Sequence, residues 1–304
     1  MAVIDAIGNT PLVEVTGLNP YRDRVRILAK LEGANPGGSV KDRIAAKMIK
    51  MGIESGDLAD GKTVLEATSG NTGIGLAMVC ASMKIRLQLF MPECVSLERR
   101  SVLQALGANL VLTPPDESTD GAIRAAQKKM ESDPDSYFMP NQFDNPYNFL
   151  AHYENTGPEV LEQTGGELDA FVAGMGTSGT LMGVSRYMKE KKKDVSIVGV
   201  EPVLGHHIQG LKNMSESICP GIFDKFRLDV VHSVTDENAF EYTRKLAVEE
   251  GLFVGMSSGA AMWGALETAK DMPAGSTVLC ILPDRGDRYL STHLFASMCA
   301  KCPP

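Results

Sequence analysis

The stretch Thr63–Gly75, TVLEATSGNTGIG, combines three features in a fixed order. A short apolar run comes first, and a loop of hydroxyl and glycine residues follows it. From Asn71 onward, apolar residues recur at helical spacing. A strand–loop–helix unit of this kind is typical of parallel sheets that are covered by helices. We therefore predict a strand over Thr63–Glu66 and a helix over Asn71–Met83.

The same alternation of apolar runs and amphipathic stretches continues in both directions along the chain. Further strands are predicted at Arg26–Leu31, Leu87–Met91, Asn109–Leu112, Ala170–Ala173, Ser196–Val200 and Thr277–Leu282. Further helices are predicted at Asp42–Ser55, Ser96–Leu106, Thr119–Glu131, Thr180–Lys189, Glu237–Glu250 and Ser258–Lys270. A chain of 304 residues is long enough for two lobes. We expect an α/β protein, with turn formers at Pro140–Pro146 marking a passage between the lobes.

Composition narrows the class of protein. Hydrophobic residues make up 43% and charged residues 22%, which is ordinary for a globular protein, and the formal net charge is -8. An acidic surface repels nucleic acid and anionic membranes, so neither is expected as a partner. The apolar runs are too short to span a bilayer and no leader is visible, so we expect a cytoplasmic location.

The six cysteines do not predict a disulfide framework, because most of them are scattered through a large chain. Cys299 and Cys302 form one CxxC near the C-terminus, which supplies at most two metal ligands. We expect a reduced tail there and no metal site. His206 and His207 are adjacent in the sequence and are interpreted as loop or interface residues.

Three glycine-bearing loops carry the functional signal. The first, Asn35–Arg43 (NPGGSVKDR), precedes a predicted helix. There Lys41 would feel the positive end of the helix dipole, which lowers the pKa of its ammonium group and suits it to Schiff-base formation and proton transfer. A surface lysine after a turn is the alternative. In the second loop, Glu66–Gly75, hydroxyls and free amides at a helix N-terminus could bind a carboxylate, or Ser69 or Asn71 could simply cap the helix.

The third loop, Gly174–Thr180 (GMGTSGT), has the successive amides and hydroxyls that bind a phosphate. It also matches the dinucleotide pattern G-x-G-x-x-G, with Glu201 lying 22 residues beyond Gly179. A nicotinamide-dependent oxidoreductase is therefore one hypothesis. It leaves the other two loops without a role, whereas a pyridoxal-phosphate (PLP) enzyme uses a lysine, a carboxylate site and a phosphate site together, so we favour the PLP enzyme.

Five spaced motifs in this order resemble the cysteine synthases, which are also called O-acetylserine sulfhydrylases. They are Gly8–Val13 (GNTPLV), Gly38–Arg43 (GSVKDR), Thr68–Gly73 (TSGNTG), Gly176–Thr180 (GTSGT) and Gly255–Gly259 (GMSSG). The resemblance runs from Ile7 to about Phe295. Cys219–Phe223 (CPGIF) and Asp284–Thr292 (DRGDRYLST) look like the B-type (CysM-like) branch.

The resemblance implies a two-lobed fold-type II PLP enzyme and a homodimer. It implies a smaller mobile lobe over 36–146 and a larger lobe over 1–35 plus 147–304. It also implies a role for each matching residue. Lys41 looks like the Schiff-base lysine, Asn71 the partner of the cofactor's phenolic oxygen, Gly176, Thr177, Ser178, Gly179 and Thr180 the phosphate loop, and Ser257 the partner of the ring nitrogen. Thr68, Ser69, Thr72 and Gln142 look like the site for the substrate's α-carboxylate.

Ser257 narrows the expected reaction. A neutral hydroxyl does not keep the ring nitrogen protonated, so the cofactor is a weaker electron sink than it is beside a carboxylate. Loss of a β-substituent is then favoured over transamination. The expected reaction is β-replacement, in which Lys41 acts as general base and O-acetyl-L-serine and sulfide, or thiosulfate, give L-cysteine.

Other activities of the same fold remain open from the sequence. Some relatives use O-phosphoserine and place an arginine near Gly210–Met214, where this chain has Lys212. Lysine lacks the bidentate fork of arginine, so Lys212 is an imperfect substitute or a solvent-exposed residue. A β-eliminating lyase or dehydratase would share Lys41 and the phosphate loop.

Overall fold

The computed structural model describes residues 2–68, 70–95, 97–215 and 219–295. The chain divides into two compact units: unit 1 is Met1–Ile7 with Asn35–Asn148, and unit 2 is Gly8–Ala34 with Phe149–Pro304. The first residues group with unit 1, whereas the sequence analysis placed them with the larger lobe. The physical reason is that Ile4 and Ile7 pack on the same apolar cluster as helix α2.

Unit 1 is built on a parallel sheet of four strands in the order β5-β4-β3-β6. Its strands are β3 (Thr63–Ala67), β4 (Arg86–Pro92), β5 (Asn109–Thr113) and β6 (Tyr137–Phe138). Its helices are α1 (Lys41–Ser55), α2 (Asn71–Met83), α3 (Leu97–Ala105) and α4 (Ser118–Ser132). Because side chains alternate along a strand, Val64 packs with α1 and α2 while Leu65 packs with α4. Helices therefore cover both faces of this sheet.

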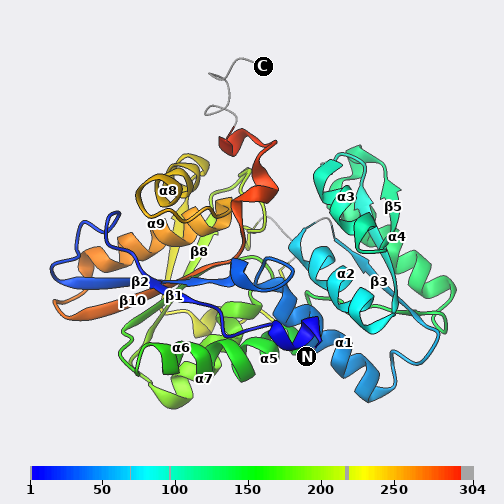
Figure 1. Ribbon diagram of the computed structural model, residues 1–304, viewed down its shortest axis with the longest axis horizontal. Coiled ribbons are helices and arrows are strands. Elements are labelled where there is room, and N and C mark those ends of the chain that lie inside the picture. Colours follow the sequence, from blue (N-terminus) through cyan, green and yellow to red (C-terminus); the bar gives the residue numbers. More distant parts are fainter. Residues whose placement is uncertain (1, 69, 96, 216–218, 296–304) are drawn as a thin grey trace. The chain divides into compact units, whose positions relative to one another are not determined.

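Unit 2 is built on a sheet of six strands in the order β1-β2-β10-β7-β8-β9, in which only the β1–β2 pair is antiparallel among the described strands (Figure 1). Its strands are β1 (Leu12–Glu14), β2 (Val25–Leu31), β7 (Ala170–Gly174), β8 (Ser196–Pro202), β9 (Val230–Val234) and β10 (Ser276–Leu282). Its helices are α6 (Gly157–Gln163), α7 (Gly179–Lys191), α8 (Asp236–Glu249) and α9 (Met256–Asp271). One face packs on α8 and α9 and the other on α6 and α7. Helix α5 (Pro146–Ala151) carries the chain from unit 1 into unit 2.

The predicted strands and helices are all present, which confirms the α/β class. The sequence analysis missed β1, β6 and β9, and it missed α5 and α6. Two of these strands have three and two residues, too short for alternation to be visible. The third, β9, lies at the edge of its sheet and exposes Val230 and Val231.

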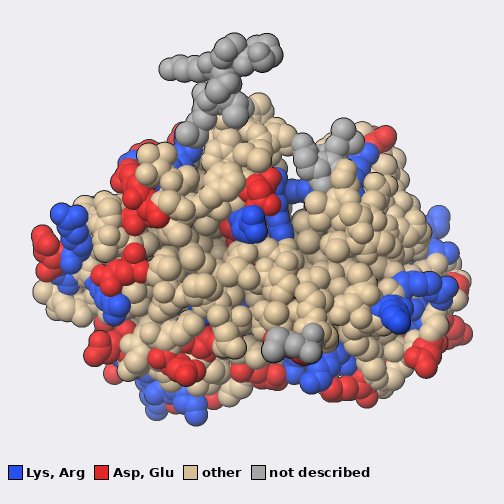
Figure 2. Space-filling view, viewed as in Figure 1, with Lys and Arg blue, Asp and Glu red and all other residues tan. Residues whose placement is uncertain are grey.

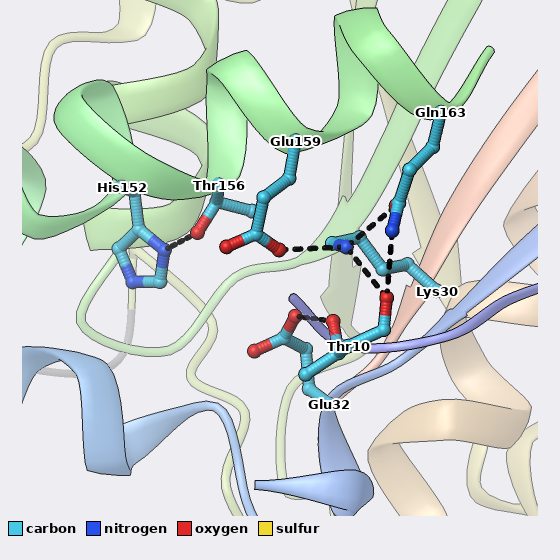
Figure 3. A network of polar contacts seen from close by, with 7 residues as sticks. All are labelled: Thr10, Lys30, Glu32, His152, Thr156, Glu159 and Gln163. Atoms are coloured by element: carbon cyan, nitrogen blue, oxygen red, sulfur yellow. Dashed lines mark hydrogen bonds and ion pairs between the residues drawn. The ribbon is translucent and has the colours of Figure 1, made fainter. Parts of the chain in front are cut away.

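A buried polar network stabilises unit 2 (Figure 3). Lys30 of β2 is fully buried, and its Nζ lies 2.8 Å from Oε2 of Glu159 on α6. The same Nζ donates hydrogen bonds to the carbonyl of Thr10 and to Oε1 of Gln163. The Thr10 hydroxyl in turn donates to Glu32 at 2.8 Å. The network joins the N-terminal stretch of unit 2 to its sheet and to α6.

Charges of both signs are interspersed over the face seen in Figure 2, which fits the modest net charge of -8. Within the described ranges, no helix combines the length and the apolar character needed to cross a bilayer.

Candidate active site

Lys41 is the first residue of α1 and is half-buried. The turn before it uses Gly38 in the left-handed region, at a φ of 81° that glycine adopts without strain. Ser39 Oγ accepts a hydrogen bond from the Lys41 amide at 3.2 Å, and Asp42 Oδ2 accepts one from the Gly37 amide at 2.6 Å. The local structure thus places Lys41 at a helix N-terminus, as the sequence indicated.

The first turns of α1 and α2 are in close contact. A Cβ atom at Gly75 of α2 would lie 3.1 Å from the Lys41 carbonyl oxygen, which is a tight contact. Glycine has no Cβ and so lets the two helices approach closely. Asn71, the first residue of α2, lies one turn before Gly75. Unit 1 therefore brings the candidate lysine and the candidate asparagine to the beginnings of two packed helices.

The carboxylate loop, Thr68–Thr72, contacts a segment that lies 70 residues away in the sequence. Thr72 Oγ1 donates a hydrogen bond to Gln142 Oε1 at 2.6 Å, and both side chains are buried. Thr68 Oγ1, also buried, accepts from the Gly70 amide at 3.3 Å. Ser69, predicted for the same site, lies outside the described residues. The structure thus brings Thr68, Thr72 and Gln142 together at the N-terminus of α2.

Glu66, in strand β3 just before this loop, was not singled out from the sequence. Its Oε1 accepts from the Ala67 amide at 3.1 Å, and its Oε2 is buried without a hydrogen-bond partner. Burial raises the pKa of Glu66 to about 7, against the lowering effect of the Ala67, Gln142 and Asn141 amides. The sequence feature that could have identified Glu66 is its position, since it is the only acidic residue of the predicted strand Thr63–Glu66.

The phosphate loop, Gly176–Thr180, follows β7 and opens α7 in unit 2. A Cβ at Gly176 would lie 2.5 Å from the Gly210 carbonyl oxygen, so this position needs glycine for a close backbone approach. Ser178 is in the left-handed region at a φ of 66°, and its Oγ is buried without a hydrogen-bond partner. A buried hydroxyl beside the amides of a helix N-terminus fits an anion that is bound there.

Thr180 leads to a second residue that the sequence analysis missed. Its Oγ1 lies 3.3 Å from Nε2 of His152. Nδ1 of His152 in turn lies 2.9 Å from the Thr156 hydroxyl, a contact drawn in Figure 3. His152 begins a π-helical turn, His152–Thr156, between α5 and α6. Such turns are frequent at functional sites, but their short length leaves no periodic pattern in the sequence.

Ser257 is the second residue of α9 and is buried. Helix α9 runs into β10, and the Gly255 amide donates to the carbonyl of Asp284, just after that strand, at 3.3 Å. The Tyr289 hydroxyl donates to Asp284 Oδ2 at 2.6 Å. Because β10 and β7 are adjacent and parallel, Ser257 and the phosphate loop share the carboxyl edge of the sheet of unit 2.

The remaining predicted residues take different positions. Lys212 is half-buried, and its amide donates to the Met175 carbonyl at 2.7 Å, so its backbone supports the phosphate loop. Nδ1 of His207 lies 2.8 Å from Asp236 Oδ2, at the surface. Among the described residues no group of His, Cys, Asp and Glu could hold a metal ion. Cys299 and Cys302 lie outside the described part of the chain.

The residues predicted to bind PLP are divided between the two units. Unit 1 holds Lys41, Asn71 and the carboxylate loop, and unit 2 holds the phosphate loop and Ser257. The chemistry of both parts fits the cofactor. The orphaned Ser178 hydroxyl and the amides of α7 suit its phosphate, and the amine of Lys41 suits its aldehyde carbon.

Known proteins resemble this chain over nearly its whole length. Residues 3–284 match the family described as "Pyridoxal-phosphate dependent enzyme". Cysteine synthase B of Escherichia coli is 45% identical over 289 residues, covering 95% of this chain and 94% of the relative. Cysteine synthase of Aquifex aeolicus is 43% identical over 300 residues, covering 97% of this chain and 92% of the relative.

A solved cysteine synthase (OASS) of Entamoeba histolytica superposes with a TM-score of 0.91 at 39% identity, covering 96% of this chain and 90% of that one. These likenesses give no support to the nicotinamide hypothesis for the Gly174–Gly179 loop. The family match, the identity to these relatives and the fold agree, and the chain belongs to the cysteine synthase branch of the pyridoxal-phosphate-dependent enzymes.

Proposed function

We propose that this protein makes L-cysteine by β-replacement, in which sulfide displaces acetate from O-acetyl-L-serine. The observation that carries the proposal is the contact between Thr72 and Gln142, because it builds a carboxylate-binding loop in the same unit as Lys41. The relatives named cysteine synthase at 43% and 45% identity support the same activity.

Lys41 is the residue that we assign to proton transfer. When bound, PLP supplies an electron sink for the charge that develops at the substrate's α-carbon. Lys41 would hold the cofactor in the resting enzyme. Once an amino acid has taken its place, its Nζ would remove the α-proton and later return a proton to the product. Its position at the N-terminus of α1 favours the neutral amine that this role requires.

The carboxylate loop would orient the substrate for that proton transfer. Gln142 uses Oε1 to accept from Thr72, so its Nε2 can donate to the substrate carboxylate. The Thr68 hydroxyl accepts from Gly70, so its own hydrogen can donate in the same way. Together with the first amides of α2, these donors suit a carboxylate better than a neutral group.

Ser257 and the phosphate loop would set the cofactor's position and electronic character. Ser257 supplies a neutral hydroxyl, which favours loss of the β-substituent over transamination. The same scheme accommodates thiosulfate in place of sulfide, or O-phosphoserine with Lys212 as an anion contact. We place O-acetylserine and sulfide first, because the relatives carry the cysteine synthase name.

A Lys41→Ala variant tests the proposal. We expect the rate of L-cysteine formation to fall by about 10³-fold or more, because the proton-transfer group is lost. Lys50→Ala is the matched control, since Lys50 is an exposed lysine of the same helix. Parent-level turnover by Lys41→Ala would contradict the assignment. Assays with O-acetylserine and O-phosphoserine, each with sulfide and thiosulfate, test the choice of substrates.

The homodimer, the cytoplasmic location and the mobility of the smaller lobe are proposals that rest on the family resemblance and the sequence. Sedimentation velocity of the purified protein tests the first, with a mass of twice 32.7 kDa as the expected result.

A further inference from the structure

Glu66 is an uncompensated acid inside unit 1. It lies in β3, and its side chain is on the same face of the sheet as Val64, because residues two apart on a strand point the same way. Only 4% of the residue is exposed. Burying a carboxylate that lacks a cationic partner is unfavourable, so a buried glutamate at this position suggests a functional role.

No cation compensates Glu66 within the described part of unit 1. The helices packed on its face of the sheet are α1, α2 and α3. Their titratable side chains that the structure describes are Lys41, Asp42, Arg43, Lys47, Lys50, Glu54, Cys80, Arg99 and Arg100. Among the described groups, none of these side chains acts on the pKa of Glu66, which burial raises and three backbone amides lower.

Those amides belong to two segments, one before Thr68 and one at Asn141–Gln142, and both segments are part of the candidate carboxylate site. Ala67, which donates to Oε1, is the residue before Thr68. The amides of Asn141 and Gln142 lie close enough to Glu66 to stabilise its charged form, although neither forms a hydrogen bond of good geometry with Oε2. Gln142 is also the partner of Thr72. One carboxyl group thus lies between the two segments that form the site.

We propose that Glu66 is a positioning residue that holds the Asn141–Gln142 backbone against Thr68 and Thr72, and that it takes up a proton from solvent when a carboxylate binds to these two residues. The proposal deepens the proposed function and rests on it. The proton balance is simple: Glu66 changes from the carboxylate to the neutral acid, and the bound ligand stays ionised.

The physical reason is repulsion between like charges. A ligand carboxylate at Thr68 and Thr72 would lie near the charge of Glu66 in a buried environment, where screening by water is weak. Two close carboxylates do not both stay ionised, and one of them gains a proton. The ligand receives charge-stabilising hydrogen bonds from the loop, while Glu66 Oε2 has no hydrogen-bond partner. Glu66 is therefore the group that is protonated.

Propionate is the probe for this proton uptake, because it has the carboxylate of the substrate but no amino group to react with the cofactor. Calorimetric titration of the PLP-loaded protein in two buffers of different ionisation enthalpy gives the protons taken up per ligand. At pH 8, where Glu66 is mostly ionised, we expect an uptake of close to one proton. At pH 6, where the acid already carries its proton, we expect an uptake near zero.

Glu66→Gln should abolish this difference, because the amide has a similar shape and does not titrate. The control is Glu54→Gln, which changes an exposed acid in the same unit. An equal uptake by the unaltered protein at pH 6 and pH 8 would overturn the proposal without any variant. An uptake at pH 8 that survives in Glu66→Gln would overturn it as well.

Kinetics provide the second readout. We expect the KM for O-acetylserine of the unaltered enzyme to rise steadily above about pH 7, while the KM of Glu66→Gln follows a flatter profile. If the protein makes no cysteine but the propionate result holds, the proposed function fails and the role of Glu66 stands.

Discussion

Lys30 in unit 2 and Glu66 in unit 1 are both buried ionisable residues of sheet strands, but their surroundings differ. Lys30 has an ion pair with Glu159 and two further hydrogen bonds (Figure 3). Glu66 accepts one hydrogen bond on Oε1 and has none on Oε2. The ammonium charge of Lys30 is balanced by Glu159, so this residue stabilises the fold of unit 2. The carboxylate charge of Glu66 has no such partner among the described groups, so its protonation can respond to pH and to a ligand.

The largest expected effect concerns the compensated charge. Lys30→Met leaves Glu159 without its partner in a nearly buried position, and we expect a loss of about 3–5 kcal/mol in the free energy of unfolding. Urea denaturation followed by circular dichroism measures it. Adding Glu159→Leu to the same protein should restore much of the loss. If Lys30→Met is as stable as the parent, the network of Figure 3 is not the structural element that we describe.

The uncompensated charge should make unit 1 less stable at alkaline pH. The pKa of Glu66 is raised from 4.5 to about 7 in the folded state. Its contribution is therefore fully present below pH 4.5 and is lost as pH rises through 7, by about 3 kcal/mol in total. Glu66→Gln should remove this dependence, because it is neutral throughout.

Urea denaturation at pH 4.5, 6 and 8 checks this prediction, with Glu54→Gln as the control for loss of an exposed acid. The difference in unfolding free energy between Glu66→Gln and the parent should grow with pH. A difference that stays constant would show that the pKa of Glu66 is not raised in the folded protein.

The two units also differ in how closely other atoms approach a glycine of their candidate ligand-binding loops. A Cβ at Gly176 of unit 2 would meet the Gly210 carbonyl at 2.5 Å, whereas a Cβ at Gly70 of unit 1 would meet nothing within 4 Å. We expect Gly176→Ala to weaken PLP binding by about tenfold, because overpacking shifts the phosphate loop. Gly70→Ala should leave PLP affinity unchanged. Fluorescence titration of the apoprotein with PLP measures both, and equal affinities would contradict the close approach.

The smallest effect is expected for the hydrogen bond between Thr72 and Gln142. Thr72→Val removes the donor but keeps the side-chain shape, at a cost of about 1 kcal/mol. The KM for O-acetylserine should rise about fivefold, while PLP affinity stays at the parent value. Thr243→Val, which removes a buried hydroxyl in unit 2, is a control. A change in PLP affinity with an unchanged KM would place Thr72 in a different site.

Elements with long periodic patterns could be predicted from the sequence, and so could the three glycine-bearing loops. Helix α2 begins and ends where the spacing of apolar residues indicated. Contacts between distant segments were not readable in this way. The partnership of Thr72 with Gln142 spans 70 residues, and it was suggested only by family resemblance. The burial of Glu66 and the contact of His152 with Thr180 depend on how elements pack, so no local pattern marks them.

The order of strands in unit 2 has a consequence for biosynthesis. Strand β10 lies between β2 and β7, yet Ser276–Leu282 is the last of the described strands to leave the ribosome. All four strands of unit 1 lie before residue 139 and are available much earlier. The sheet of unit 1 should therefore form first in the nascent chain. Until β10 has been synthesised, β2 and β7 lack the strand that pairs with both of them, and their backbone edges and apolar side chains stay exposed. Translation pauses or truncation before Ser276 should give a half-folded, chaperone-dependent product.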